Sequence, residues 1–379
     1  MPNAVASAVK LLPVLASVFI LSMPSNAQTS APDSLEFKIG QMLLVGFRGF
    51  AVSDTSAIVK DIRERHIGAV ILFDYDVPSK TAIRNIESPK QVAQLCRSLQ
   101  QFSSMQTALP LLIAIDQEGG KVSRLKEKYG FKRSVSQEYL GRLNRLDSTR
   151  VYGRATALQL RELGVNVNFA PCVDVNLNAQ NPIIGGKERS FSSNPSVVAQ
   201  HALAVIDEHR KQNVLTAIKH FPGHGSSAAD SHLGVVDVTK QWTRAELAPF
   251  KAVIDADSAD MVMTAHIFNA HWDTVPATLS RNVITKLLRD TLRFRGVVVS
   301  DDMQMKAIAA QYGLEDAVKL ALLAGVDMLT FGNNMDYDER IAEKAVSIIK
   351  KLVAENVISR ERIDDSYRRI AALKARLKQ

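Results

Sequence analysis

Short, continuous apolar runs recur along this chain, and segments with helical periodicity separate most of them. The runs occupy residues 42–47, 69–73, 111–115, 167–173, 214–218, 261–267, 296–299 and 328–331. Parallel strands that are buried on both faces have such continuous runs, whereas half-exposed strands alternate. Amphipathic stretches of helical length lie between them, at 53–66, 89–105, 149–163, 195–211 and 314–324. Eight strands alternating with helices predict an α/β fold, a (β/α)₈ barrel of the TIM type.

The same pattern predicts one domain over residues 28–379, with a short leading helix at 35–40 and two closing helices within 342–377. A doubly wound open sheet is the alternative architecture. No GxGxxG follows the first apolar run, and the GGK triplets at 119–121 and 185–187 lack the spacing of a phosphate-binding loop. No repeat or linker divides the chain, so the barrel remains the preferred prediction.

The first 27 residues have the pattern of a secretory signal peptide. Lys10 is their only charged residue, an apolar run covers 11–23, and Ser25-Asn26-Ala27 precede Gln28. The apolar run is short for a membrane span, and small residues suit processing after Ala27. An uncleaved anchor or a buried helix is the alternative. We therefore expect an exported protein, periplasmic or secreted, with no stable membrane insertion after the signal is removed.

The composition permits a large core and gives little indication of a macromolecular partner. The chain is 46% hydrophobic and has a formal net charge of +8. This charge would favour acidic polymers such as anionic envelope material, but the charges in 124–133 and 368–378 alternate with apolar residues, as on solvated helix faces. No basic patch interleaved with aromatic residues indicates nucleic acid. The two cysteines, Cys96 and Cys172, are expected to be buried rather than part of a disulfide framework.

Polar residues gather directly after several apolar runs. In this type of barrel, the carboxyl ends of the strands form the active face. The residues that follow or end a run, and that we therefore expect near one another, are Asp116, Asp174, Lys219, His220, His266, Asp301 and Asp302.

The segment 218–232, IKHFPGHGSSAADSH, carries the densest set of chemical groups. Asp230 and His232 are two residues apart, so in extended backbone their side chains leave on the same side. A carboxylate bonded to an imidazole fixes its tautomer and raises its proton affinity, which suits a general acid and base near neutral pH. The glycines and small residues from 223 to 229 predict that the loop is free to move.

A metal site is the competing interpretation of this segment. His220 and His224 are four residues apart, as in helical zinc motifs, but Pro222 and Gly223 between them are incompatible with a helix interior. No HExxH is present. We expect neither a metal nor a cofactor.

Asp301 and Asp302 end an apolar run, and alternation along a strand lets only one of them face the barrel mouth. That residue is a candidate nucleophile. Alternatively, both cap a following helix, which is an ordinary role for Asp. A carboxylate nucleophile together with a proton donor matches retaining glycoside hydrolysis, although a His as the proton donor is unusual for that chemistry.

This combination resembles the family 3 glycoside hydrolases of the β-N-acetylhexosaminidase type, over nearly the whole chain after residue 27. The most specific part is KHFPGHG at 219–225 with DSH at 230–232. Supporting segments are IGQMLLVGF at 39–47, RNIESP at 84–89, DQEGGKVSR at 116–124, RSF at 189–191, TAH at 264–266 and SDDMQM at 300–305.

The resemblance implies a role for each matching residue. Asp301 is then the nucleophile, and His232 is the acid/base that Asp230 orients. Asp302, Asp174 and His266 would surround these groups. The pocket for a terminal N-acetylglucosamine would consist of Asp116, Arg124, Arg189, Lys219 and His220.

We therefore expect an exported, monomeric, exo-acting retaining β-N-acetylglucosaminidase that acts on cell-wall fragments, as in peptidoglycan turnover, or on chitooligosaccharides. The alternative activities are a β-N-acetylglucosaminide phosphorylase, because an imidazole tolerates incoming phosphate better than a carboxylate does, and a β-glucosidase of the same family. A wall protein that only binds sugar is the non-enzymatic alternative.

Overall fold

The computed structural model describes Met1 and residues 34–377, and it contains a closed barrel of eight parallel strands. Around the barrel the strand order is β1, β10, β9, β7, β5, β4, β3 and β2. Each of the eight apolar runs overlaps one barrel strand, so the predicted fold is confirmed. The strands are β1 (Leu43–Gly46), β2 (Ala69–Leu72), β3 (Leu112–Ile115), β4 (Val167–Asn168), β5 (Leu215–Phe221), β7 (Met261–Thr264), β9 (Val297–Asp302) and β10 (Met328–Phe331).

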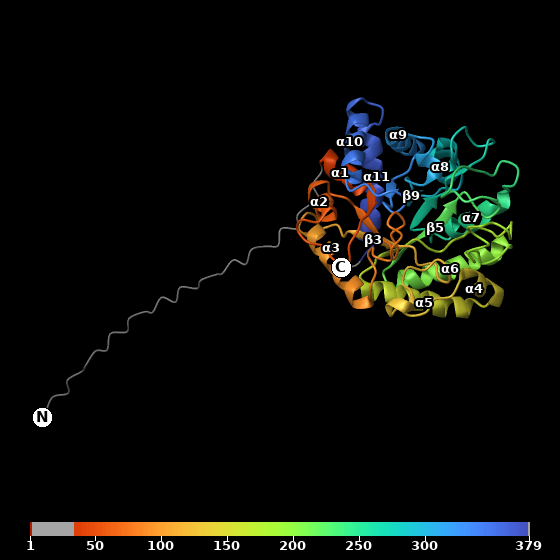
Figure 1. Ribbon diagram of the computed structural model, residues 1–379, viewed down its shortest axis with the longest axis horizontal. Coiled ribbons are helices and arrows are strands. Elements are labelled where there is room, and N and C mark those ends of the chain that lie inside the picture. The colour runs from red at the N-terminus through yellow and green to blue at the C-terminus, as the bar shows by residue number, and fades with distance from the viewer. Residues whose placement is uncertain (2–33, 378–379) are drawn as a thin grey trace.

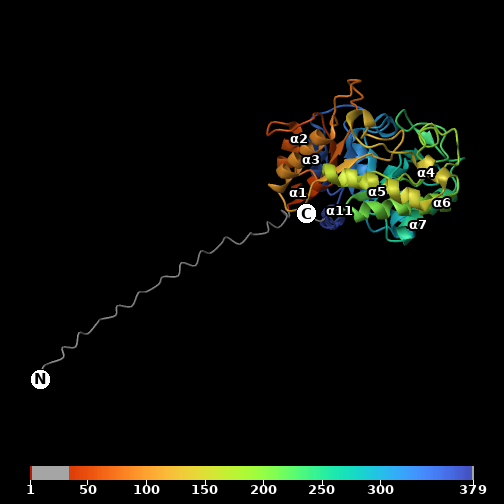
Figure 2. The same cartoon turned by 90° about the horizontal axis from the view of Figure 1, so that it is seen from below.

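Helices surround the strands on all sides (Figures 1 and 2). They include α2 (Ala57–Glu64), α3 (Pro89–Ser104), α5 (Leu146–Leu163), α6 (Pro195–Lys211), α7 (Ala248–Asp255), the π-helix η4 (Asn282–Thr291) and α9 (Leu314–Ala324). Their ends follow the sequence: Ser88 accepts a hydrogen bond from Gln91 N and Pro89 opens α3, while Gly164 ends α5 in the left-handed region at φ 80°.

The two ends of the described chain meet beside the barrel. The leading helix α1 (Leu35–Gln41) packs against the closing helices α10 (Ile341–Ala354) and α11 (Arg360–Ala375), with the rings of Phe37 and Tyr367 edge to face at 5.9 Å. Lys374 of α11 donates to Gln41 Oε1 at 2.6 Å in a buried position. The predicted signal peptide over residues 1–27 and its junction at Gln28 lie outside the described residues, apart from Met1.

Smaller elements shape the loops at the carboxyl ends of the strands. They are α4 (Gln137–Leu143), α8 (Lys306–Ala309) and the short helices η1 (Glu127–Tyr129), η2 (Arg244–Leu247) and η3 (Ala277–Leu279). Outside the barrel, β6 (Val236–Asp237) pairs in parallel with β8 (Ile267–Phe268). This pair ties the chain after the β5 loop to the chain after β7. Within the described residues, no helix combines the length and apolar character that crossing a membrane requires.

Candidate active site

All eight residues predicted for the site line one cavity of about 390 Å³. The cavity lies where the barrel strands end, and its lining also includes Phe73 and Gly332, which follow or end other strands. The structure therefore brings together side chains that are up to 185 positions apart in sequence, namely Asp116, Arg124, Arg189, Lys219, His220, Asp230, His232 and Asp301.

Asp301 lies at the end of β9 and is held as a carboxylate. Burial opposes its ionisation, but His266, His220 and His232 surround it and keep its pKa below the ordinary value of 3.8. Its Oδ1 accepts the backbone N–H of Asp302 at 2.8 Å. An ionised, oriented carboxylate facing a cavity can act as a nucleophile.

Asp302 also lines the cavity, so the expectation that only one of the pair faces the barrel mouth is wrong. The pairing of β10 with β9 shifts register between Met328 and Thr330, and this irregularity breaks the simple alternation. Asp302 Oδ1 accepts backbone N–H groups from Gln304 and Gly332, both at 3.0 Å, and so joins the ends of β9 and β10. Burial raises the pKa of this carboxyl to about 6.

Asp230 and His232 form the predicted pair. His232 Nδ1 and Asp230 Oδ1 are 2.7 Å apart, and the same oxygen accepts the backbone N–H of His232 at 2.9 Å. The backbone here forms a turn rather than the extended segment we expected, and the second bond is the reason the two side chains still meet. Because Nδ1 is bonded to the carboxylate, Nε2 is the nitrogen that remains for a substrate.

The loop that leads to this pair is buried in its first part and exposed in its second. Residues 222–227 are buried, whereas 228, 229, 232, 233 and 235 are exposed. The expectation that small residues make the whole segment mobile is therefore wrong for its first half, because groups distant in sequence enclose it.

A buried charge network lies along one side of the cavity: Asp116, Lys219 and Arg189 line it, and Glu118 lies behind them. Glu118 accepts Arg189 Nε and Nη2 at 2.8 and 2.7 Å, and Lys219 Nζ lies 2.8 Å from the same carboxylate. Lys219 also donates to Asp116 Oδ1 at 2.7 Å. Burial would raise the pKa of Glu118, but Arg189 and Lys219 lower it to about 2. Glu118 was not predicted from the sequence, although it stands two residues after Asp116 and both carboxylates contact Lys219.

Arg124 lies between two carboxylates at the other side of Asp116. Its Nη2 is 3.5 Å from Asp116 Oδ2, its Nη1 is 3.9 Å from Asp74 Oδ1, and its guanidinium lies 5.5 Å from the Phe73 ring centre. Asp74 is buried, lines the cavity and pairs with Lys126 at 2.5 Å. Asp74 is a second site residue that sequence reasoning missed.

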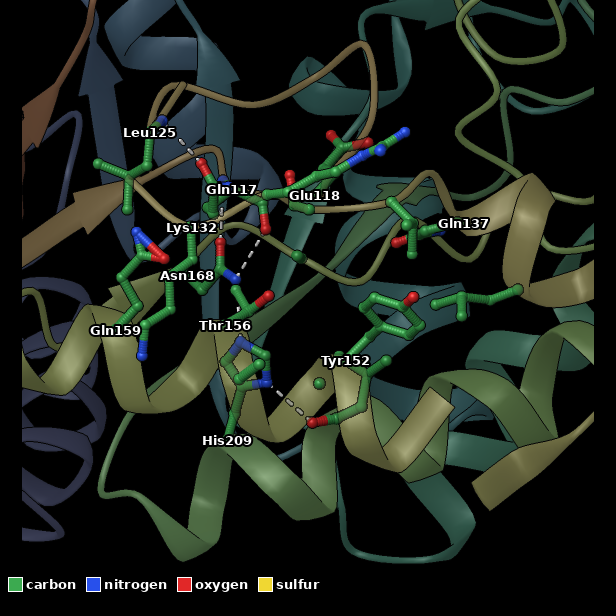
Figure 3. A pocket seen from close by; sticks show the side chains of 18 of the residues that line it. Gln117, Glu118, Leu125, Lys132, Gln137, Tyr152, Thr156, Gln159, Asn168 and His209 are labelled. Atoms are coloured by element: carbon green, nitrogen blue, oxygen red, sulfur yellow. Dashed lines mark hydrogen bonds between the residues drawn. The ribbon is translucent and has the colours of Figure 1, made fainter. Parts of the chain in front are cut away.

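A small cavity behind the 116–118 segment shows how that segment is supported (Figure 3). Asn168 Oδ1 accepts Gln117 N at 3.1 Å, and Asn168 Nδ2 donates to Gln117 O at 3.1 Å and contacts His209 Nε2 at 3.0 Å. His209 Nδ1 lies 2.9 Å from Val205 O, and burial lowers the pKa of His209 to about 4. A neutral His209 that accepts at Nε2 satisfies both contacts, so this cavity belongs to the scaffold.

Cys172, Asp174 and His220 are the residues best placed to hold a metal ion in the described part of the chain, with ligand atoms within 4.8 Å of one another. Asp174 Oδ2 instead accepts the Cys172 thiol at 3.1 Å and lies 2.7 Å from His220 Nδ1. Burial and Asp174 raise the pKa of Cys172 well above its ordinary value, which disfavours the thiolate that a metal requires. Hydrogen bonding therefore explains this cluster better than ligation does. His224, which the competing metal interpretation paired with His220, directs Nδ1 to Ser227 Oγ at 2.7 Å.

Comparison with known proteins identifies the family of the chain. The model of the glycosyl hydrolase family 3 N-terminal domain matches residues 34–373. The chain belongs to glycoside hydrolase family 3.

Two curated relatives carry hexosaminidase names. "Beta-hexosaminidase A" of Pseudoalteromonas piscicida is 32% identical over 397 residues, which cover 95% of this chain and 64% of the relative. "Beta-hexosaminidase" of Tolumonas auensis is 35% identical over 278 residues, covering 72% of this chain and 78% of the relative. The match thus spans less than two thirds of the length of the Pseudoalteromonas protein.

Solved structures show the same fold. A family 3 β-N-acetylglucosaminidase from Paenibacillus sp. superposes with a TM-score of 0.82 at 37% identity, over 90% of this chain and 62% of that one. A β-N-acetylhexosaminidase from Beutenbergia cavernae superposes with a TM-score of 0.81 at 29% identity, over 91% of this chain and 100% of that one.

Proposed function

We propose that this protein is an exo-acting, retaining β-N-acetylhexosaminidase that removes terminal N-acetylglucosamine residues. The observation that carries the proposal is the shared cavity of Asp301 and the Asp230–His232 pair, which supplies a nucleophile and a proton donor. The names of the relatives support the choice of substrate.

In the first step, Asp301 attacks the anomeric carbon while the bond to the leaving oxygen breaks. His232 gives its Nε2 proton to that oxygen, and Asp230 stabilises the protonated imidazole before the transfer. The product is a glycosyl ester on Asp301. In the second step, His232 takes a proton from water, the water oxygen attacks the anomeric carbon, and the ester bond to Asp301 breaks.

The charge network suits the recognition of a sugar. The carboxylate of Asp116 can accept hydrogen bonds from hydroxyl groups, while Arg124, Lys219, His220 and Arg189 direct donors or ring nitrogens toward the same cavity. Because Arg189 and Lys219 are held by Glu118, and His220 by Asp174, these three side chains need little rearrangement when a sugar binds.

We further propose that the enzyme acts outside the inner membrane as a monomer, on cell-wall fragments or chitooligosaccharides. The support for the location is the signal-like pattern of residues 1–27.

A phosphorylase is the second candidate, and the observation in its favour is that the acid/base is an imidazole rather than a carboxylate. A neutral or cationic base repels an incoming phosphate less than an anion would.

Hydrolysis of p-nitrophenyl N-acetyl-β-glucosaminide, with and without inorganic phosphate, tests these proposals. The hydrolase should release N-acetylglucosamine at a rate that does not depend on phosphate. Release of a sugar phosphate would identify the phosphorylase, and preference for p-nitrophenyl β-glucoside would identify a β-glucosidase. Binding of sugar without turnover of either substrate would contradict an enzymatic function.

A further inference from the structure

The loop that carries the Asp230–His232 pair starts from a buried segment, residues 222–227, which we name the loop root. Side chains from outside this loop hold its backbone: Trp242 Nε1 donates to Pro222 O at 3.2 Å, Asn181 Nδ2 donates to His224 O at 2.8 Å, and Glu246 accepts two N–H groups. Glu246 Oε2 accepts the N–H of Gly225 at 2.7 Å and that of Ser226 at 3.3 Å, while Oε1 accepts the Ser226 hydroxyl at 2.5 Å.

Glu246 is unusual because it is a fully buried carboxylate without a cation. It is 0% exposed, and no ion pair to it is found among residues 34–377. Burial, and to a smaller extent the negative charge of Asp174, raises the pKa of Glu246 to about 7, although its hydrogen bonds with Gly225 and Ser226 act to lower it. Burying a polar group is unfavourable unless its hydrogen bonds are made. The three contacts with the loop root satisfy this requirement.

The fit around the loop root is close on both sides. A Cβ on Gly225 would lie 1.7 Å from Val175 O, and a Cβ on Gly223 would lie 2.5 Å from the Cβ of Glu246. On the opposite side, Asp174 Oδ1 accepts His224 N at 2.7 Å. The loop root is therefore clamped between the chain that follows β4 and the short helix η2.

The rest of the loop has far fewer contacts of this kind. Residues 228 and 229 are exposed, and the backbone bonds of the turn are Leu233 N to Asp230 O at 3.0 Å and Ala307 N to Ser231 O at 3.3 Å. Beyond the turn, the chain is fixed again at β6. The position of His232 is thus set largely by the two ends of the loop, and Glu246 secures the first end together with Asp174 and Asn181.

We propose that Glu246 is a positioning residue for the acid/base, which fixes the loop root so that His232 reaches the leaving oxygen. The inference rests on the proposed function of His232. Loss of Glu246 should then impair proton donation more than attack by Asp301, because Asp301 belongs to β9 and makes no contact with the loop root among the hydrogen bonds of the described residues.

This leads to a test that depends on the leaving group. A substrate with a good leaving group, p-nitrophenyl N-acetyl-β-glucosaminide, needs little protonation, whereas N,N′-diacetylchitobiose needs a proton donor. In Glu246→Ala, kcat/KM for the disaccharide should fall about tenfold or more beyond the fall for the p-nitrophenyl substrate, within the roughly 10²–10⁴-fold that general acid catalysis supplies.

Two further variants refine the test. In Glu246→Gln, the amide oxygen can still accept the two backbone N–H groups and the NH₂ can donate to Ser226 Oγ, so it should retain most of the disaccharide activity. Ser226→Ala removes one contact and should show the same leaving-group pattern in weaker form, which keeps the test available should Glu246→Ala fail to fold.

The matched control is Asp61→Asn. Asp61 is also buried, and burial raises its pKa to about 7, but it lies on α2 and bonds to Arg65. Its replacement should affect both substrates equally.

Equal losses on both substrates in Glu246→Ala and Ser226→Ala, in an active parent enzyme, would overturn the positioning role. A Glu246→Gln enzyme as impaired as Glu246→Ala would also overturn it. If the parent enzyme turns over neither substrate, the proposed function itself fails, so the two failures are distinguishable.

Discussion

Replacing Glu118 by Gln should destabilise the folded protein strongly, because the variant leaves two buried cations facing a neutral amide. The side chains of Glu118, Lys219 and Arg189 are 1%, 2% and 10% exposed. Removing one partner from such a buried network costs about 3–5 kcal/mol. The pKa of Glu118 gives an independent value for this loss of stability. Its lowering from 4.5 to about 2 corresponds to about 3 kcal/mol at ~1.4 kcal/mol per pH unit. Since Lys219 keeps Asp116, we expect the lower end of the range, about 3 kcal/mol.

The difference in unfolding free energy between the parent and Glu118→Gln should decrease at low pH. A carboxyl whose pKa is depressed in the folded state stabilises the protein fully above its unfolded value of 4.5, and this stabilisation is lost as the pH falls through about 2. The free-energy gap between parent and Glu118→Gln should therefore be about 3 kcal/mol near pH 7 and shrink to roughly 1–2 kcal/mol near pH 3.

Urea unfolding at the two pH values measures the gap, and Asp207→Asn is the matched control. Asp207 also pairs with two cations, Arg150 at 2.5 Å and Lys211 at 2.9 Å, but its side chain is 45% exposed. Its replacement should cost about 0–1 kcal/mol. The reasoning would be refuted by a loss in Glu118→Gln no larger than that in Asp207→Asn, or by a gap that stays constant on acidification.

Three further predictions concern stability, metals and export. Burial lowers the pKa of Lys374 from 10.5 to about 7, so the unfolded state binds the Lys374 proton more tightly than the folded state does. Lys374→Met should therefore raise the free energy of unfolding by about 2 kcal/mol near pH 7, once the lost hydrogen bond to Gln41 is subtracted. Urea unfolding should show this gain vanishing as the pH rises through 10.5. Turnover of the p-nitrophenyl substrate should survive exhaustive chelation, because the proposed steps use only side chains of the chain; loss of activity that zinc restores would contradict this. N-terminal sequencing of envelope-localised protein should give a start at or near Gln28, and a start at Met1 would exclude the processing site.

The barrel could be predicted because its strands are buried on both faces and therefore leave continuous apolar runs. The agreement is weakest at β4, where only Val167–Asn168 of the predicted 167–173 run forms a strand. The site residues could be placed on one face because the barrel brings the carboxyl ends of all its strands together. Motif matching supplied the candidate roles of Asp301 and His232.

Other features could not be predicted because they depend on partners distant in sequence. Glu118 meets Arg189 71 residues away, and Glu246 meets the loop root 20 residues before it. The small residues of the root suggested mobility, and only the packing shows that they allow close approach of neighbouring chain. Arg84 of the RNIESP motif also has partners distant in sequence. It is 0% exposed and donates to Asp76 at 2.6 Å and to Asn333 O at 2.8 Å, so it joins the loops that follow β2 and β10.

The most direct test of the account is to trap the covalent intermediate in a His232→Ala variant. An activated substrate can still transfer its sugar to Asp301, but the variant lacks the base for the second step, so the ester should accumulate. After incubation with p-nitrophenyl N-acetyl-β-glucosaminide, intact mass should increase by one N-acetylhexosamine, peptide mapping should locate the sugar on Asp301, and azide should speed its release. A label on Asp302, or no label in a variant that still releases p-nitrophenol, would contradict the assignment of Asp301 as nucleophile and His232 as acid/base.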